Sequence, residues 1–121
     1  DPVVIGRGVF TSAGCSGCHG PTGGGGVGPA LDTVTKTFPK FEDQIAWVTN
    51  GSAAVKGQPY GATGRIATGG MPGFGSSLSK AQIIAVVCHE RVDYAKESPV
   101  NPQCQAGAAA AAAASPGSGT K

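Results

Sequence analysis

The chain has 121 residues, which is enough for one domain of modest size. Nine Lys and Arg residues against seven Asp and Glu residues give a formal net charge of +2. This balance excludes a basic stripe for tracking nucleic-acid phosphates and a polybasic membrane patch. Glycine accounts for 21 residues, while aromatic residues make up only 6%. Side chains therefore offer little bulk for a core, and we expect a large apolar ligand to fill the interior.

The first segment predicts a helix. Asp1 is a favoured N-cap and Pro2 suits the first helical position. We expect the helix to reach about Ala13, with an apolar face made by Ile5, Val9 and Phe10. Residues 14–30 then predict a turn and a glycine-rich loop. The glycine run at 23–26 lacks the Gly-Lys-Ser/Thr sequence of a phosphate-binding loop, so we expect it to lie over the edge of a bound ring.

Residues 15–19 read Cys-Ser-Gly-Cys-His, the C-x-x-C-H pattern of c-type haem attachment. Two thiols three positions apart can each form a thioether with one vinyl group of the same porphyrin, which places His19 under the ring at the iron. A thioredoxin-like redox pair is one alternative, but the strand–helix alternation that houses such a pair is absent. A zinc site completed by Cys88, Cys104 or His89 is another, but it lacks a second paired spacing. A chance match is the third.

The middle of the chain predicts one short helix and one long loop. The helix spans 41–50 and ends at Gly51, with three side chains facing inward: Ile45, Trp47 and Val48. Residues 52–70 show no sustained period and predict a loop, with at most one helical turn, that wraps the haem. Three groups here are candidate donors to haem propionates, although a packed Trp and a solvated Arg suit the sequence equally well. They are Trp47, Tyr60 and Arg65.

Met71 is the only methionine, and it lies in the sequence Gly-Gly-Met-Pro-Gly-Phe-Gly at 69–75. The glycines let the backbone pass close to a flat ring, and Pro72 stiffens the loop. Because a Met in such a loop does not belong to a regular helical stripe, we interpret it as a sixth iron ligand rather than core filling. Methionine–histidine ligation raises the reduction potential of a haem. His89 is the alternative ligand, but a histidine on a helix is usually solvated or packed.

Residues 79–82 read Ser-Lys-Ala-Gln, a capping box before an apolar run. The helix that it starts is predicted to continue to about Ala95 and to end before Pro99. Its predicted buried stripe consists of Ile83, Ile84, Val87 and Cys88.

With both haem motifs present, the chain resembles class I cytochromes c of the small bacterial type over about residues 3–95. The resemblance implies an all-α, cytochrome c-like fold of three to five helices wrapped around one covalently attached haem c. It also implies that Cys15 and Cys18 form the thioethers and that His19 and Met71 are the axial iron ligands.

Further positions match the family pattern. Gly28-Pro29 corresponds to the family's Gly-Pro, whose Pro carbonyl accepts a hydrogen bond from Nδ1 of the proximal histidine. Gly6 and Phe10 correspond to positions where the N-terminal helix crosses the C-terminal one. The chain departs from the pattern at His89, where the family usually has Tyr or another aromatic residue.

We divide the chain into a cytochrome c domain, 1–97, and an extended tail, 98–121. The resemblance implies haem attachment outside the cytoplasm, where a leftover pair of cysteines favours a disulfide between Cys88 and Cys104. Such a bond would close a loop of about 15 residues and stabilise the fold by roughly 3 kcal/mol; a buried free thiol at Cys88 is the alternative. The low-complexity end of the tail is expected to pack on a partner chain.

The resemblance implies one-electron transfer in a respiratory or photosynthetic chain rather than catalysis, because two filled axial positions leave no place for a substrate at the iron. We expect redox-protein partners, either for a mobile carrier or for a subunit or tethered domain of a membrane-bound complex. The protein is not expected to bind nucleic acid. The sequence contains no apolar run of about 18 residues, the length that a membrane-spanning helix needs. The expected location is the periplasm or the outer face of the cytoplasmic membrane, with a signal peptide or anchor outside this sequence. The alternative is a haem enzyme, or a gas or redox sensor, with a displaceable Met71.

Overall fold

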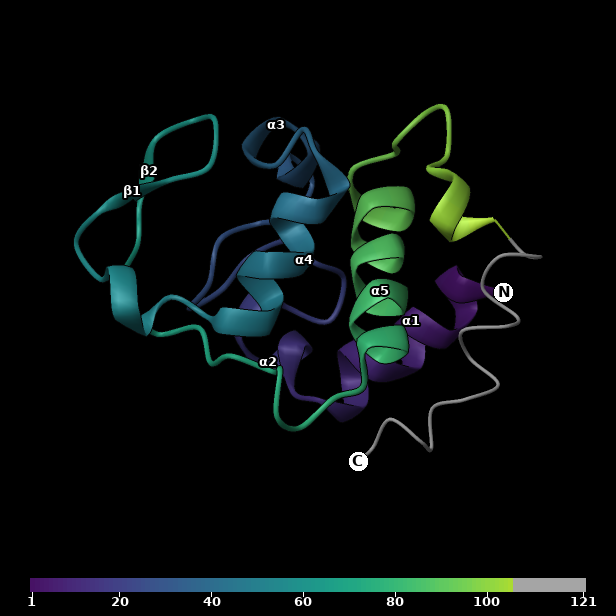
Figure 1. Ribbon diagram of the computed structural model, residues 1–121, viewed down its shortest axis with the longest axis horizontal. Coiled ribbons are helices and arrows are strands. Elements are labelled where there is room, and N and C mark those ends of the chain that lie inside the picture. The colour runs from purple at the N-terminus through teal and green to yellow at the C-terminus, as the bar shows by residue number, and fades with distance from the viewer. Residues whose placement is uncertain (106–121) are drawn as a thin grey trace.

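The computed structural model describes residues 1–105 and is mainly helical (Figure 1). The expected partner contact of the low-complexity tail lies outside the described residues. In chain order the elements are α1 (Pro2–Ser12), α2 (Cys15–His19), α3 (Val34–Thr37), α4 (Phe41–Asn50), the 3₁₀ turn η1 (Ala53–Val55), β1 (Pro59–Tyr60), β2 (Arg65–Ile66), α5 (Lys80–His89), the wider π-helical turn η2 (Glu90–Tyr94) and the 3₁₀ turn η3 (Pro102–Cys104). The predicted all-α fold is confirmed.

Helix α1 begins and ends close to where the sequence predicts. The Asp1 carboxylate accepts a hydrogen bond from the Val3 amide at 2.9 Å, and Pro2 occupies the first turn. The helix ends at Ser12, one residue before the predicted end. Its buried face includes Val9 and Phe10 as expected, whereas Ile5 is only half-buried and Val3 lies deeper.

Helix α1 crosses α5 at backbone distance (Figure 1). A Cβ atom added to Gly6 would lie 1.9 Å from the Ala85 carbonyl oxygen, so only glycine permits this approach. Helix α5 starts with the predicted capping box, in which the Ser79 hydroxyl accepts from the Gln82 amide at 3.1 Å and the Gln82 side chain accepts from the Ser79 amide at 2.8 Å. The pair α1–α5 is the main helix contact of the fold.

The last helix continues through η2 to Tyr94, one residue before the predicted end, with Ala95 as its C-cap. Its predicted stripe is wrong at one position, because Ile84 is half-buried while Ala85 and Val86 are buried. The reason is that α5 contacts both α1 and α4, so its buried surface is wider than a single stripe.

Helix α4 and the segment that follows it differ in part from the prediction. Helix α4 covers the predicted range, but its fully buried residues are Phe41, Gln44 and Val48, with Trp47 and Ile45 half-buried. The expected turn in 52–70 is η1. The same segment also forms a two-stranded antiparallel hairpin that the sequence analysis missed, since two-residue strands leave no period to detect.

A disulfide joins Cys88 of α5 to Cys104 of η3, as predicted. Both residues are buried in the core, with 0% and 3% of their surface exposed. The bond therefore holds the segment after the last helix against that helix.

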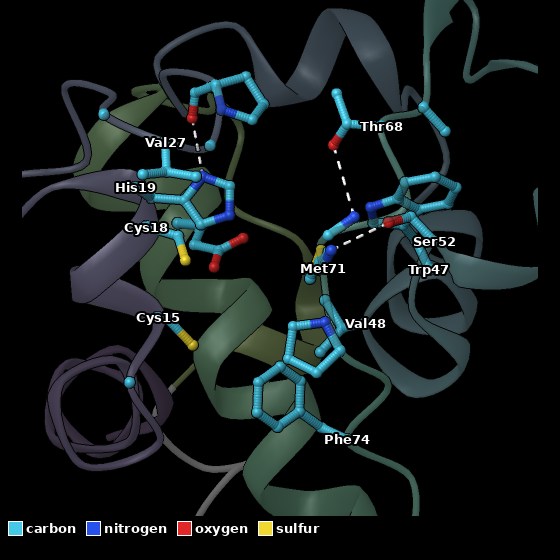
Figure 2. A pocket seen from close by; sticks show the side chains of 18 of the residues that line it. Cys15, Cys18, His19, Val27, Trp47, Val48, Ser52, Thr68, Met71 and Phe74 are labelled. Atoms are coloured by element: carbon cyan, nitrogen blue, oxygen red, sulfur yellow. Dashed lines mark hydrogen bonds between the residues drawn. The ribbon is translucent and has the colours of Figure 1, made fainter. Parts of the chain in front are cut away.

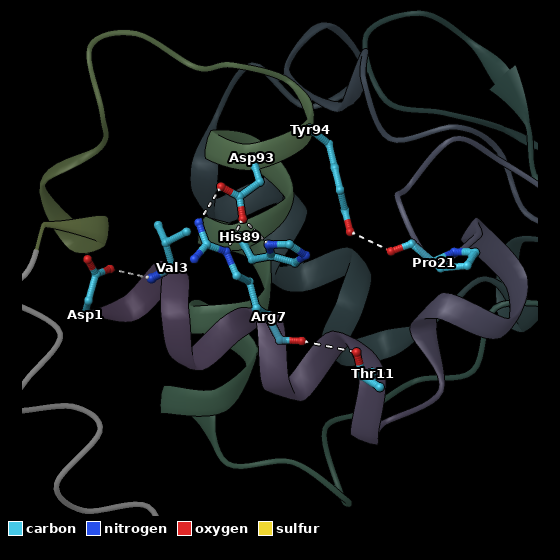
Figure 3. A network of polar contacts seen from close by, with 8 residues as sticks. All are labelled: Asp1, Val3, Arg7, Thr11, Pro21, His89, Asp93 and Tyr94. Carbon is cyan, nitrogen blue, oxygen red and sulfur yellow. Dashed lines mark hydrogen bonds and ion pairs between the residues drawn. The ribbon is translucent and has the colours of Figure 1, made fainter.

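A polar network crosses the α1–α5 interface beside the core (Figure 3). The Arg7 guanidinium donates to both oxygens of Asp93 at 2.7 and 3.0 Å, and His89 Nδ1 lies 2.6 Å from the same carboxylate. The His89 ring also meets Phe10 edge to face, with 5.2 Å between centroids. The imidazole thus packs between the helices at the position where the family usually has an aromatic residue. His89 does not line the cavity described below.

Close packing at Gly6 generates the first prediction. Gly6→Ala places a methyl group on the Ala85 carbonyl, so we expect the free energy of unfolding to fall by about 1–3 kcal/mol. The matched control is Gly8→Ala on the same helix, where an added Cβ meets nothing within 4 Å. That control is expected to gain about 0.5–1 kcal/mol from helix propensity. Denaturant unfolding of both variants measures the difference, and equal stabilities would contradict the crossing.

The burial of His89 is expected to make stability fall in mild acid. Burial lowers the pKa of His89 below its ordinary 6.5, although the Asp93 carboxylate opposes the shift. The folded state therefore binds fewer protons at His89 than the unfolded chain does, and stability is lost as the pH falls below about 6.5. We expect His89→Gln, which stays neutral, to flatten this decline in unfolding free energy. An unchanged decline would assign it to other groups.

Candidate functional site

A cavity of about 430 Å³ opens between α2, the loop at 26–29, the end of α4, the hairpin, the loop at 70–74 and α5. Its volume lies in the range of roughly 300–1,000 Å³ that is common for cofactor and small-molecule sites. Figure 2 shows Cys15, Cys18 and His19 along one wall and Met71, Ser52 and Trp47 on the opposite side. Residues that are far apart in the described chain thus line the same cavity.

The short helix α2 carries the C-x-x-C-H sequence into the cavity. Gly14, with φ of 84°, separates α1 from α2, so the chain turns before the first cysteine. His19 Nδ1 lies 2.7 Å from the Pro29 carbonyl oxygen. Because a carbonyl can only accept, Nδ1 carries the proton and Nε2 keeps its lone pair for a metal. This is the contact that the Gly-Pro sequence predicts.

Gly28 lets the loop lie flat against that imidazole. A Cβ atom at this position would stand 2.9 Å from His19 Cε1, closer than such atoms approach. The loop therefore sets the tilt of the His19 ring as well as its tautomer.

The Met71 loop is held against the end of α4 by a ladder of hydrogen bonds. Ser52 makes two of them, donating its amide to the Met71 carbonyl at 3.0 Å and accepting the Met71 amide on its hydroxyl at 3.0 Å. Farther along, Phe74 donates to the Val48 carbonyl and Gly75 to the Thr49 carbonyl, both at 3.0 Å. Ser52 is 3% exposed, so its two bonds are shielded from water. The loop presents the Met71 side chain to the cavity from a fixed backbone.

The three candidate propionate donors line the cavity together. The Trp47 and Tyr60 rings are stacked with centroids 4.2 Å apart, and Arg65 follows on the paired strand. Burial raises the pKa of Tyr60, so its hydroxyl stays protonated and can donate. The structure thus gathers two neutral donors and one cation on one side of the cavity.

The thiol and zinc alternatives do not fit this arrangement. Cys15 and Cys18 are not bonded to each other, and burial raises the pKa of Cys15 to about 11, whereas redox-active thiols have a lowered pKa. Cys88 and Cys104 are consumed by their disulfide. Within residues 1–105 no group of three or more His, Cys, Asp or Glu side chains could hold a metal ion.

The same residues fit a haem c. An imidazole with a free Nε2, a thioether sulfur and two unbonded thiols border one largely apolar cavity of suitable size. The glycine at 28 leaves space beside the imidazole that a side chain would fill. The donor set and the cavity would therefore suit a covalently attached porphyrin whose iron is held by protein side chains.

Three polar residues at the site were not predicted from the sequence: Ser52, which fastens the Met71 loop, and the buried pair Gln44 and Glu90. One signal was available for Glu90. It follows Val86 by four residues, so the two share a face of the last helix, and both line the cavity. Nothing in the sequence marks Ser52 or Gln44, because their roles depend on segments that meet only in the fold.

Residues 3–98 match the family model described as Cytochrome c. The comparison with curated proteins gives no match. None of the described helices is long and apolar enough to span a membrane. The matching family implies covalently bound haem and haem-based electron transfer.

The Ser52 contacts generate a prediction that needs no bound cofactor. Ser52→Ala leaves the Met71 amide without its partner, so we expect a loss of about 1–3 kcal/mol in unfolding free energy and faster amide exchange at Met71. Thr68→Ala is the matched control, because its hydroxyl accepts a longer bond of 3.5 Å from the exposed Gly70 amide. We expect that control to stay within about 0.5 kcal/mol of the parent. Similar losses in both variants would mean that the Ser52 bonds do not hold the loop.

Proposed function

The chain belongs to the cytochrome c family, and from that premise we propose that it carries single electrons on one haem c. In this proposal Cys15 and Cys18 bind the haem covalently, and His19 and Met71 are its axial iron ligands. The observation that carries the proposal is that all four side chains border the same cavity. When bound, the haem supplies a one-electron couple between ferric and ferrous iron.

The chain's own residues prepare this site. The Pro29 carbonyl holds His19 in the tautomer that leaves Nε2 free, and the ladder from Ser52 to Gly75 fixes the backbone of Met71. A site held in this way needs little rearrangement when an electron arrives or leaves. Trp47 and Arg65 offer hydrogen-bond donors and a positive charge for the propionates on the far side of the cavity.

A carrier fits the site better than an enzyme or a sensor. Two protein ligands leave no axial position for a substrate or gas unless Met71 moves away, and its loop is tied down at both ends. We therefore propose transfer to and from other redox proteins, as a mobile carrier or as part of a respiratory or photosynthetic complex.

The mouth of the cavity suits brief contacts with such partners. Val27 and Ile66 line the cavity and are 92% and 55% exposed, so they form a small apolar rim at its opening. A small rim of this kind favours weak, transient docking. We place the protein outside the cytoplasm, which the buried disulfide between Cys88 and Cys104 supports.

Optical spectra of the protein purified with its cofactor test the proposal. We expect the sharp reduced bands of low-spin haem c, a weak far-red band from Met–iron ligation when oxidised, and no response of the reduced protein to CO. A high-spin spectrum or rapid CO binding would favour the enzyme or sensor alternative. Absence of haem absorption would overturn the proposal.

The Met71→Ala variant tests the sixth ligand directly. Removing the thioether is expected to abolish the far-red band, to lower the reduction potential and to let CO bind to the reduced protein. The proposal fails on Met71 if the variant keeps the far-red band. The Ser52→Ala variant, which retains the thioether, serves as a control for damage to the loop alone.

A further inference from the structure

Glu90 is a buried carboxyl in the wall of the cavity, and the proposed electron transfer makes no use of it. The residue is 6% exposed and stands one helical turn after Val86, which also lines the cavity. Its Oε1 accepts a hydrogen bond from the Gln44 side-chain amide at 2.8 Å. Its Oε2 has no hydrogen bond among the described residues. Among these residues, the one fully buried side-chain polar atom without a partner is Glu97 Oε1, so Glu90 Oε2 is not fully buried. Since the side chain lines the cavity, the free oxygen faces it.

Within residues 1–105 no cation forms an ion pair with this carboxyl. The guanidinium of Arg91, which shares Gln44 with Glu90, is 2% exposed and is fully engaged elsewhere. Arg91 donates to Glu97 at 2.7 and 3.0 Å, to the Gln44 side-chain oxygen at 3.0 Å and to the carbonyls of Phe38 and Pro39 at 2.6 and 3.2 Å. The charge of Arg91 is therefore balanced by Glu97, and Gln44 stands between Arg91 and Glu90 as a neutral bridge.

The other elements around Glu90 bring few charges. The titratable or charged groups that line the cavity with it, or that interact with it through space, are Cys15, Cys18, His19, Tyr60, Arg65 and Tyr94. None of them makes a hydrogen bond or an ion pair with Glu90 in the described part of the chain. Burial raises the pKa of Glu90 to about 8, while the Gln44 hydrogen bond opposes the shift. At neutral pH the acid form is therefore favoured, and the ionised form becomes populated as the pH rises toward about 8.

We propose that Glu90 binds one proton from solvent when the haem gains an electron and releases it when the electron leaves. This inference rests on the proposed function, since it requires the haem in this cavity. A ferric haem core carries a net positive charge and a ferrous core does not, so only the oxidised state offers the buried carboxylate an opposite charge. The coupling is reciprocal: reduction of the haem raises the proton affinity of Glu90, and protonation of Glu90 raises the reduction potential of the haem.

The step balances in charge and atoms. The electron comes from a one-electron redox protein and reduces ferric to ferrous iron. The proton comes from water and forms an O–H bond on the Glu90 carboxylate, which becomes the neutral acid. Return of the electron to an acceptor protein reverses both. The net charge buried in the cavity is then the same in both redox states, which avoids leaving an unpaired carboxylate in a low-dielectric space.

Potentiometric titration of the haem-loaded protein at a series of pH values tests the proposal. We expect the midpoint potential to fall with rising pH by up to about 59 mV for each tenfold drop in proton concentration, the limit for one proton per electron. Glu90→Gln keeps the shape and the Gln44 contact but cannot ionise, and it is expected to lose this slope. The matched control is Glu42→Gln, the same change at an exposed position of α4 outside the cavity, which should keep it. An equal slope in Glu90→Gln would assign the proton to another group and overturn the proposal.

A second measurement uses the unmodified protein and so does not depend on how the variant folds. Reduction in weak buffer with a pH indicator should show proton uptake. The reduced-minus-oxidised infrared spectrum should gain the carbonyl stretch of a protonated carboxylic acid. Absence of both signals from a protein with intact low-spin bands overturns the role of Glu90 and leaves the carrier proposal in place. A spectrum without low-spin haem c would overturn both together.

Discussion

The backbone contact between Gly6 and the Ala85 carbonyl is the constraint on which the rest of the architecture depends. Helix α2 follows α1 after a single turn, so the position of α1 sets where the C-x-x-C-H residues stand. Helix α5 and the turn η2 that continues it in turn bring Val86 and Glu90 to the wall of the same cavity. The relative position of these two groups of lining residues is therefore set by one helix crossing. A larger residue at this crossing would shift one group relative to the other.

The interior holds two glutamates in different electrostatic settings. Glu97 is paired with the buried guanidinium of Arg91, which also binds two backbone carbonyls and so ties the end of the last helix to the segment before α4. Glu90 has only a neutral amide as partner and faces the cavity. A paired charge fixes structure, whereas an unpaired carboxyl responds to whatever charge enters beside it. Adjacent residues of one helical turn thus serve stability at Arg91 and ligand-linked chemistry at Glu90.

The four cysteines divide by their surroundings rather than by their chemistry. Cys88 and Cys104 lie in the packed core, where their disulfide fastens the segment after the last helix. Cys15 and Cys18 lie on one short helix at the cavity and remain unbonded. Because the fold keeps the two pairs in different places, covalent stabilisation and cofactor attachment do not compete for the same thiols.

Local patterns by themselves determined the helices that carry strong signals and the residues with distinctive chemistry. The cap at Asp1, the capping box at Ser79, the C-x-x-C-H sequence and the single methionine are all short-range features, which is why they could be found without a structure. Only the tertiary structure decided the roles of Ser52, Gln44 and Glu90, and it alone revealed the hairpin. Their partners are distant in the chain, as in the bonds that join Ser52 to Met71 and Gln44 to Glu90. A side chain that is buried among neighbours from other segments is not marked by any local period or motif in the sequence. Its environment, and with it its charge, therefore follows from the fold.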